Sequence, residues 1–261
     1  MTENVLLDFD HTYAYAEEAH ETGPRYMDLS DITGTDMFCT QESADKIRNR
    51  LQGTGPGGIH FLDNGNYHYA TLFFVEKIRE PFTLVLIDHH TDMQKPLISH
   101  LLSCGSWAGT LLLHNRYLRQ LILIGPEKTA MESIEERFRS KLICISMEQI
   151  GTEEERSKFG NIDLHVPVYI SIDKDVLSPY YARTNWNQGE MTVDILEKLL
   201  LEMFVHQRVI GVDICGECSL QEPLPKLTED TKINLETNKE IYKYIKKLIS
   251  LQKAHLEEEN L

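Results

Sequence analysis

Two short polar segments each follow an apolar run of strand length. Asp88, His90 and Asp92 occupy alternate positions in the first segment. Asp173 and Asp175 do the same in the second. Alternate side chains of an extended backbone point to one face. Each segment therefore predicts a cluster of metal-binding or acid–base groups on one face of a strand end.

The carboxylates of these segments need a counter-charge, because burial of unpaired charge is costly. Basic residues are scarce nearby, and Lys174, between two of the aspartates, is expected to point the other way. A divalent cation is the natural counter-charge. Four carboxylates and two imidazoles, one of them from His68, suit a pair of hard ions such as Mn²⁺ better than a thiolate zinc site. Two metals that share carboxylates can hold a hydroxide at neutral pH and polarise an electrophile.

Two further strand ends carry polar residues. In one, Gly65 could supply a turn before His68. In the other, Asp213 and Glu217 lie at the end of an apolar run. A single aspartate or histidine in such a place is more often a turn former, a cap or a loop residue than a ligand. The paired motifs therefore carry the metal prediction.

Apolar runs alternate with amphipathic stretches, which predicts an α/β fold with three αβα layers and a mainly parallel, doubly wound sheet. No linker rich in Pro, Gly or Ser divides the chain, so we expect one domain over residues 1–261. Ligands bind outside the carboxyl ends of strands in such sheets, where the polar segments lie. The expected strands are Val5–Phe9, Ile59–Leu62, Thr83–Asp88, Leu121–Ile124, Leu142–Ile145, Val168–Ile172 and Val209–Ile214. The expected helices are Gln41–Leu51, Tyr67–Arg79, Trp107–Leu118, Ser133–Ser140, Thr192–Val205 and Glu240–Leu256, the last within a C-terminal helix over about 228–256, with Thr40 and Thr192 as N-caps.

The chain has 41 acidic and 26 basic side chains among 261 residues, a formal net charge of −15. This excess argues against a nucleic-acid surface, which needs clustered Lys and Arg. It permits a small cationic substrate, since a negative field attracts one. Acid excess also fits a protein that merely stays in solution, so charge alone identifies no function.

No apolar run reaches the roughly 18 residues of a membrane span, and the first residues show no secretory signal. The five cysteines form no dense, even framework, so we expect a reducing, cytoplasmic location and no membrane association. Cys215 and Cys218 form a CxxC pair that lacks a second pair, which argues against a zinc or redox role. Cys104 lacks the pattern of a nucleophile and is expected in a pocket wall or the core.

The metal-binding motifs resemble those of the arginase/agmatinase/formiminoglutamase (ureohydrolase) superfamily, of which the chain would be a divergent member. The segment DHHTD at residues 88–92 resembles the family's DAHxD motif, and SIDKD at 171–175 resembles its SxDxD motif. GNYHY at 65–69 is similar to the GGDHS segment. The matches keep the family's order and spacing within roughly residues 58–217.

The resemblance implies an arginase-like fold, a binuclear manganese centre and a homo-oligomer. In this family a metal-bridging hydroxide attacks a guanidinium-type carbon. The implied reaction is hydrolysis of a linear C–N bond in a guanidino or amidine-type compound, with Asp92 orienting the hydroxide. By position, His68 and Asp92 would bind one ion, His90 and Asp175 the other, and Asp88 and Asp173 would bridge them.

Several departures from the family bear on substrate recognition. His89 stands where the family usually has a small residue, and we expect it to pack rather than to bind metal. Ala108 replaces the histidine of the arginase SGNLHG segment, and Ser106 stands at the asparagine used for amino-acid recognition. Ordinary arginine is therefore not the expected substrate. Ser106 and Trp107 stay candidate substrate contacts.

Two later segments supply the other candidate substrate contacts. The loop over residues 183–192 differs from the family's usual loop, and its Trp186 and Gln188 are candidates. Glu217 resembles the glutamate that binds the guanidinium in the family's DxxE segment. Gly216 occupies the direct position, so Glu217 would act through a bulge. We expect Asp92 and Glu217 to be the catalytic residues.

Two other functions stay open. A deacetylase-like amidohydrolase would share an Asp-x-His pair and adjacent histidines but would use a single zinc ion. A non-catalytic metal-binding protein on the same fold would explain both Ala108 and the displaced Glu217. The number of bound ions and the turnover of a guanidino compound separate the three functions.

Overall fold

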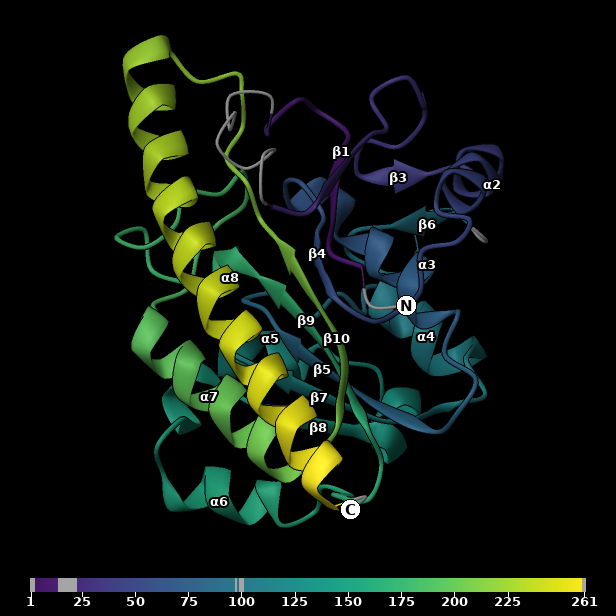
Figure 1. Cartoon of the computed structure of the whole chain (residues 1–261), viewed down its shortest axis with the longest axis vertical. Helices are drawn as coiled ribbons and strands as arrows, with labels where there is room; N and C mark the ends of the chain where they lie inside the picture. The colour runs from purple at the N-terminus through teal and green to yellow at the C-terminus, as the bar shows by residue number, and fades with distance from the viewer. Residues whose placement is uncertain (1–2, 14–22, 97, 99–100, 260–261) are drawn as a thin grey trace.

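A parallel eight-stranded sheet forms the centre of the protein (Figure 1). The computed structural model describes residues 3–13, 23–96, 98 and 101–259. The strand order is β2-β1-β4-β10-β9-β5-β7-β8, and every neighbouring pair is parallel. The strands are β1 (Val5–Asp8), β2 (Arg25–Asp28), β4 (Ile59–Phe61), β5 (Phe82–Ile87), β7 (Leu118–Ile124), β8 (Leu142–Ile145), β9 (Val168–Asp173) and β10 (Val209–Cys215).

The seven predicted strands are all present, with small shifts at their ends. The edge strand β2 was not predicted, because its sequence RYMD carries no apolar run and only Met27 is buried. A small antiparallel pair, β3 (Phe38–Cys39) and β6 (Leu102–Ser103), was also not predicted. Two-residue strands have no periodicity that a sequence pattern could reveal.

Each face of the sheet carries its own apolar core. Along β5, Leu84 and Leu86 belong to one core, and Val85 and Ile87 belong to the other. This alternation follows from the two-residue period of a strand. Burial on both faces explains why the central strands are continuous apolar runs rather than alternating ones.

Helices cover both faces, which gives the predicted three layers. On one side α7 (Val193–His206) and α8 (Leu224–Glu259) pack on the sheet, and α8 runs diagonally beside α7 (Figure 1). On the other side lie α2 (Gln41–Arg50), α3 (Thr71–Val75) and α4 (Trp107–His114). Shorter elements are α5 (Lys128–Glu132), α6 (Glu153–Phe159) and the 3₁₀ helices η1 (Gly65–Ala70), η2 (Glu136–Lys141), η3 (Met147–Gln149) and η4 (Lys174–Val176).

The predicted helices lie where helical segments are found, but several of their boundaries were wrong. The predicted helix Trp107–Leu118 ends at His114, because the Asn115 side chain accepts hydrogen bonds from the backbone amides of residues 117 and 118 and turns the chain into β7. The predicted helix Tyr67–Arg79 is η1 followed by α3. The predicted helix Ser133–Ser140 begins at the C-cap of α5 and otherwise coincides with η2. The C-terminal helix starts earlier than predicted, at Leu224, with Pro225 in the first turn, where no amide donor is needed.

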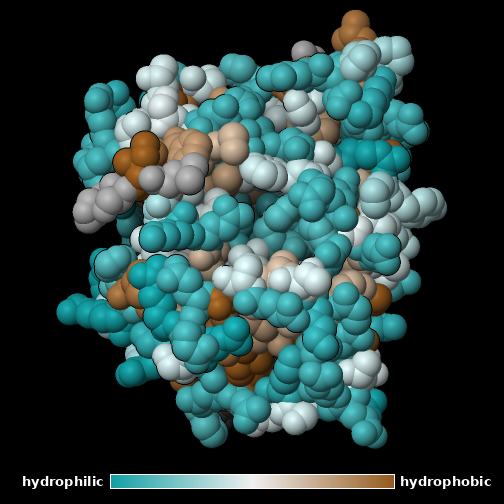
Figure 2. Space-filling view, turned by 180° about the vertical axis from the view of Figure 1, so that it is seen from behind, coloured by the Kyte–Doolittle hydropathy of each residue, from teal (hydrophilic) through white to brown (hydrophobic). Residues whose placement is uncertain are grey.

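Polar residues cover most of the face shown in Figure 2, with apolar patches between them. Over the part of the chain that the structure describes, no helix is both long enough and apolar enough to cross a bilayer.

The predicted N-caps Thr40 and Thr192 are both confirmed. Their hydroxyls accept from the amides of Ser43 and Ile195, respectively. We expect Thr192→Ala to lower the free energy of unfolding by about 1 kcal/mol, because the first turn of α7 loses its acceptor. Urea denaturation measures the loss. Thr192→Ser keeps the oxygen and should recover most of the stability, so equal losses in both variants would contradict the capping role.

Candidate metal centre

The parallel sheet brings the two predicted polar segments together. Strands β5 and β9 are neighbours, and Ile87 pairs with Ile172 at their carboxyl ends. The segments that begin at Asp88 and Asp173 therefore leave the sheet side by side. His68 comes from η1, whose first turn is capped by the side chain of Asn64. Five of the six predicted metal ligands are buried, and His90 is partly exposed.

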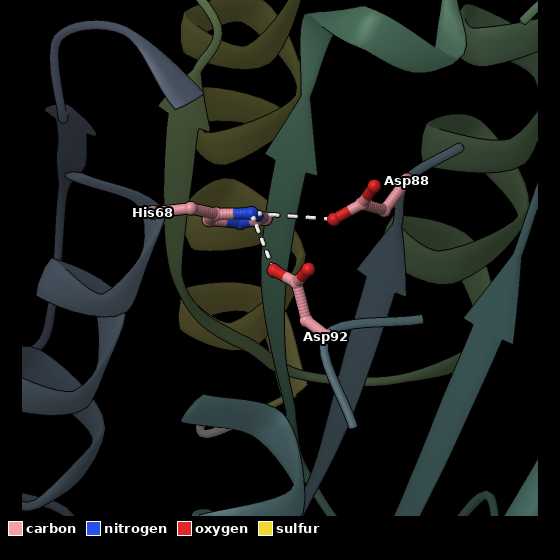
Figure 3. Close-up of side chains that lie close together, drawn as sticks. All are labelled: His68, Asp88 and Asp92. Atoms are coloured by element: carbon pink, nitrogen blue, oxygen red, sulfur yellow. Dashed lines mark ion pairs between the residues drawn. The ribbon is translucent and has the colours of Figure 1, made fainter. Parts of the chain in front are cut away.

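His68 lies at the centre of the first cluster (Figure 3). Its Nδ1 atom lies 3.2 Å from Asp88 Oδ2 and 3.1 Å from Asp92 Oδ2. Asp173 Oδ2 lies 3.3 Å from the same nitrogen. One imidazole nitrogen thus faces three carboxylates, and the ligand atoms of His68, Asp88 and Asp92 are close enough to share one ion.

A second cluster forms around His90. Its Nδ1 atom lies 2.7 Å from Asp175 Oδ2 and 3.6 Å from Asp88 Oδ1. These three residues could also share one ion. The two oxygens of Asp88 therefore face different clusters, Oδ2 toward His68 and Oδ1 toward His90. A carboxylate placed in this way can bridge two cations.

The far nitrogen of each histidine has its own partner. His68 Nε2 lies 2.9 Å from Ser171 Oγ, which in turn lies 3.0 Å from Thr71 Oγ1. His90 Nε2 lies 2.9 Å from Asn187 Oδ1. When Nε2 carries the hydrogen, the lone pair of Nδ1 is directed at the carboxylates, which is the tautomer that a metal ligand needs.

Burial and mutual repulsion disfavour charge on the carboxylates. Burial raises the pKa of Asp92 to about 6, and burial also raises the pKa values of Asp173 and Asp175. Burial acts in the same sense on Asp88, but His68 and His90 outweigh it and lower the pKa of this carboxyl below its usual range.

The excess of negative charge favours the protonated, positively charged form of the two imidazoles. Burial alone would lower the pKa of each histidine, but the neighbouring carboxylates raise the pKa of His68 well above normal and that of His90 to about 12. Asp88 Oδ2 is buried without a well-aligned hydrogen-bond donor, although His68 lies nearby. Positive charge would therefore stabilise the site, and its carboxylate and imidazole ligand atoms fit hard divalent ions.

Asp92 is clamped to the start of α4. Its backbone has a φ of 50°, in the left-handed region that non-glycine residues rarely adopt. Its carbonyl oxygen accepts from the amides of Ala108 and Gly109, and its Oδ2 accepts from Trp107 Nε1 at 2.5 Å. Trp107 is fully buried. The candidate substrate contact is thus a support for Asp92, and Ala108 lies in the core beside it.

The clusters form the floor of a cavity of about 190 Å³. This is below the roughly 300–1,000 Å³ of common small-molecule pockets, so it admits a short ligand. Of the sequence-predicted site residues, the six metal-ligand candidates and Trp186 line it. The other lining residues are Met37, Phe38, Gly65, Gln94, Lys95, Ser103, Cys104 and Gly105.

Four candidate substrate contacts do not line this cavity. Ser106 is buried and lies 2.7 Å from Ser103 through their hydroxyls, and Trp107 supports Asp92. Gln188 donates to the carbonyl oxygens of residues 177 and 182 and so shapes its own loop. Glu217 is the fourth and is engaged elsewhere.

Glu217 accepts hydrogen bonds from Lys174 Nζ at 2.6 Å and from Asn238 Nδ2 at 2.7 Å. The Lys174 side chain is fully buried and points away from the aspartates on either side of it, as expected. The structure shows why Gly216 cannot be replaced by a glutamate, since a Cβ there would lie 2.5 Å from Asp173 Oδ1. Glu217 therefore pairs with the buried Lys174 just after β9, and its hydrogen bond from Asn238 links this pair to α8.

Several lining residues were not predicted. Gln94 and Lys95 come two and three residues after Asp92, and this position was a usable signal. Met37 and Phe38 come from a distant segment without a motif, so only the fold brings them here. Cys104 lines the wall, which is one of the two places expected for it, and burial raises the pKa of its thiol to about 12, which makes it a poor nucleophile.

The support of Asp92 by Trp107 is testable. We expect Trp107→Phe to weaken Mn²⁺ binding by about 10- to 100-fold, because the carboxylate loses the donor that orients it. Calorimetric titration with Mn²⁺ measures this. The matched control is Trp186→Phe, since the Trp186 indole donates to Asn66 and packs edge-on against the His90 ring but gives no hydrogen bond to a metal-ligand candidate, and phenylalanine keeps an aromatic ring there. Equal affinities in the two variants would refute the assigned role.

Gly65 makes room for the indole of Trp186. A Cβ at this position would lie 2.5 Å from Trp186 Cδ1. We expect Gly65→Ala to push the indole outward and to shift its fluorescence to longer wavelength. The chain has two tryptophans, so the Trp107→Phe background isolates this signal. Gly160→Ala is the control, since its nearest contact would be an ordinary 3.4 Å, and an unchanged spectrum for Gly65→Ala would contradict the packing.

Comparison with known proteins agrees with the motifs. Solved structures share the fold, and two of them serve as examples. Proclavaminate amidino hydrolase from Streptomyces clavuligerus has a TM-score of 0.63 at 15% identity, covering 94% of this chain and 92% of that one. Trypanosoma cruzi formiminoglutamase with Mn²⁺ has a TM-score of 0.58 at 10% identity, covering 89% and 92%.

Similarity in sequence is more direct. An uncharacterized protein of Thermotoga maritima is 32% identical over 232 residues, which cover 88% of this chain and 85% of that protein. The arginase-family model matches residues 13–220. The predicted superfamily and fold class are confirmed, and the chain belongs to the arginase family.

Proposed function

We propose that this protein is a two-metal hydrolase that cleaves a linear C–N bond of a guanidino or amidine-type compound. The observation that carries the proposal is the position of Asp88, whose two oxygens face two separate histidine–aspartate clusters. Membership of the arginase family supports a hydrolase of this class.

Six residues would hold the ions: His68, Asp88, His90, Asp92, Asp173 and Asp175. The four carboxylates would balance the formal charge of two divalent ions, and Mn²⁺ is the first choice because a structural neighbour carries it. When bound, such ions lower the pKa of a water molecule and polarise the carbon that it attacks.

The chain's own residues would position the reaction. Asp92, held by Trp107, would accept a hydrogen bond from the attacking water. Ser171 and Asn187 would hold the two imidazoles in the binding tautomer. Trp186 would form one wall over the substrate.

The proposal is tested with Mn²⁺-loaded protein and a panel of guanidino, amidino and formimino compounds. We expect two ions per chain by elemental analysis and release of urea, ammonia or an amine from at least one compound. Asp88→Asn should reduce the metal content and lower turnover by at least about 100-fold, because it weakens the bridge between both clusters. The matched control Asp194→Asn changes an exposed residue of α7 and should leave both unchanged.

Metal content and turnover together separate the competing functions. One tightly held zinc ion would favour the deacetylase-like alternative. Two bound ions without turnover of any compound in the panel would favour a non-catalytic protein on this fold. Either result would overturn the proposed function.

A further inference from the structure

The C-terminal helix α8 has a buried polar face in its first half. Asp230, Asn234 and Thr237 recur there at helical spacing, and all three are buried. Further along the helix the same face becomes apolar with Ile241 and Ile245, which belong to a core of the sheet. A buried polar side chain lowers stability unless it is hydrogen-bonded, so the polar half of this face needs partners of its own.

The partners belong to one loop, residues 181–188, which we call the site loop. Asn234 pairs with both backbone groups of Arg183. Its Oδ1 atom accepts from the Arg183 amide at 2.8 Å, and its Nδ2 atom donates to the Arg183 carbonyl oxygen at 2.7 Å. Two hydrogen bonds to one residue fix its orientation as well as its position. An alanine at position 234 would leave both backbone groups without these partners.

Two further side chains of α8 strengthen the attachment. Asp230 Oδ1 lies 3.3 Å from Arg183 Nε, and the Thr237 hydroxyl donates to the carbonyl oxygen of Tyr181. The first residues of the site loop are therefore held on α8 through both backbone and side-chain atoms.

Hydrogen bonds inside the site loop connect its first residues to its last ones. The Thr184 hydroxyl donates to the carbonyl oxygen of Trp186 at 2.9 Å, and Gln188 Nε2 donates to the carbonyl oxygen of Ala182 at 3.1 Å. The amide of Thr184 donates to Gln188 Oε1 at 3.3 Å. A shift at the α8 end would therefore be passed along the loop rather than absorbed within it.

Two residues of the site loop reach the candidate metal centre. Trp186 lines the cavity, and its ring centroid lies 5.8 Å from that of His90. Asn187 Oδ1 lies 2.9 Å from His90 Nε2. The loop is also attached to η1, where Trp186 Nε1 donates to Asn66 Oδ1 at 2.9 Å. The loop thus spans from α8 to η1 and carries one cavity wall and one partner of a metal-ligand candidate.

We propose that Asn234 is a positioning residue for the candidate metal centre. It does not line the cavity itself. It holds the site loop on α8 and thereby places Trp186 in the cavity wall and Asn187 against His90. The effect on turnover rests on the proposed function, whereas the effects on the tryptophan and on metal binding do not.

The position of Trp186 is tested with Asn234→Ala in metal-free protein. The Trp107→Phe background leaves Trp186 as the only tryptophan. We expect its emission to move to longer wavelength and its quenching by acrylamide to increase. The matched control is Asn49→Ala, which removes an exposed asparagine of α2 and should leave the emission unchanged. A role in stability alone would lower the urea midpoint of unfolding without moving the emission of the folded protein.

The position of Asn187 is tested by calorimetric titration with Mn²⁺, with Trp107 intact. Asn234→Ala should weaken binding at the cluster that contains His90 by about tenfold, because this imidazole loses the partner that orients it. Asn49→Ala should bind Mn²⁺ as the wild type does.

A second variant decides the question if Asn234→Ala does not fold. Thr237→Ala removes only the bond to Tyr181, and it should change the Trp186 emission in the same direction but by less. Thr237→Ser keeps the hydroxyl and should restore the wild-type emission. The matched control is Thr228→Ala, since the exposed Thr228 hydroxyl donates only within α8, to the carbonyl oxygen of residue 224.

These readouts distinguish the inference from the proposed function. The expected changes in emission and Mn²⁺ affinity, in a protein whose wild type turns over no compound of the panel, would sustain the inference and remove the proposed function. Where the wild type turns over a compound, Asn234→Ala should raise its KM by about tenfold at saturating Mn²⁺ with kcat nearly constant. An unchanged emission or an unchanged Mn²⁺ affinity in the folded variants would overturn the inference and leave the proposed function standing.

Discussion

The burial of four carboxylates beside two imidazoles is the constraint on which the rest of the site depends. Negative groups this close together raise one another's pKa values, and burial adds to the effect. Without a metal, the histidines can supply part of the missing positive charge as protons. Two divalent ions would supply it in full and would satisfy the buried oxygen of Asp88 that lacks a donor. Burying these charges without a counter-ion would lower the stability of the fold, whereas the same arrangement suits a site that binds metal ions.

Much of the surrounding structure keeps these groups in position. The neighbouring ends of β5 and β9 bring the two aspartate segments together, and the start of α4 holds Asp92 in a left-handed conformation. Trp107 donates a hydrogen bond to Asp92, and Ser171 is hydrogen-bonded to His68, so each fixes the orientation of one metal-ligand candidate. Such strain at one residue persists only where its surroundings over-determine it. The same contacts explain why Trp107 belongs to the support of the site rather than to its surface.

The departures from the family's motifs acquire physical meaning in the fold. A side chain at position 216 would collide with Asp173, so the glutamate there has been displaced by one residue. Glu217 then neutralises the buried Lys174 and joins α8 to the site through Asn238. The glutamate expected to bind the guanidinium therefore does not line the cavity.

The sequence alone determined the fold class, seven of the eight strands of the sheet and the set of metal-ligand candidates. Buried parallel strands leave continuous apolar runs, and alternate polar residues at their ends mark one face. These signals are local, so they can be read along the chain. The helix boundaries depended on side-chain contacts such as those of Asn115, which no periodicity encodes. Only the tertiary structure decided the roles of Trp107, Gln188 and Glu217, because each role depends on hydrogen-bond partners that the residue types alone do not specify.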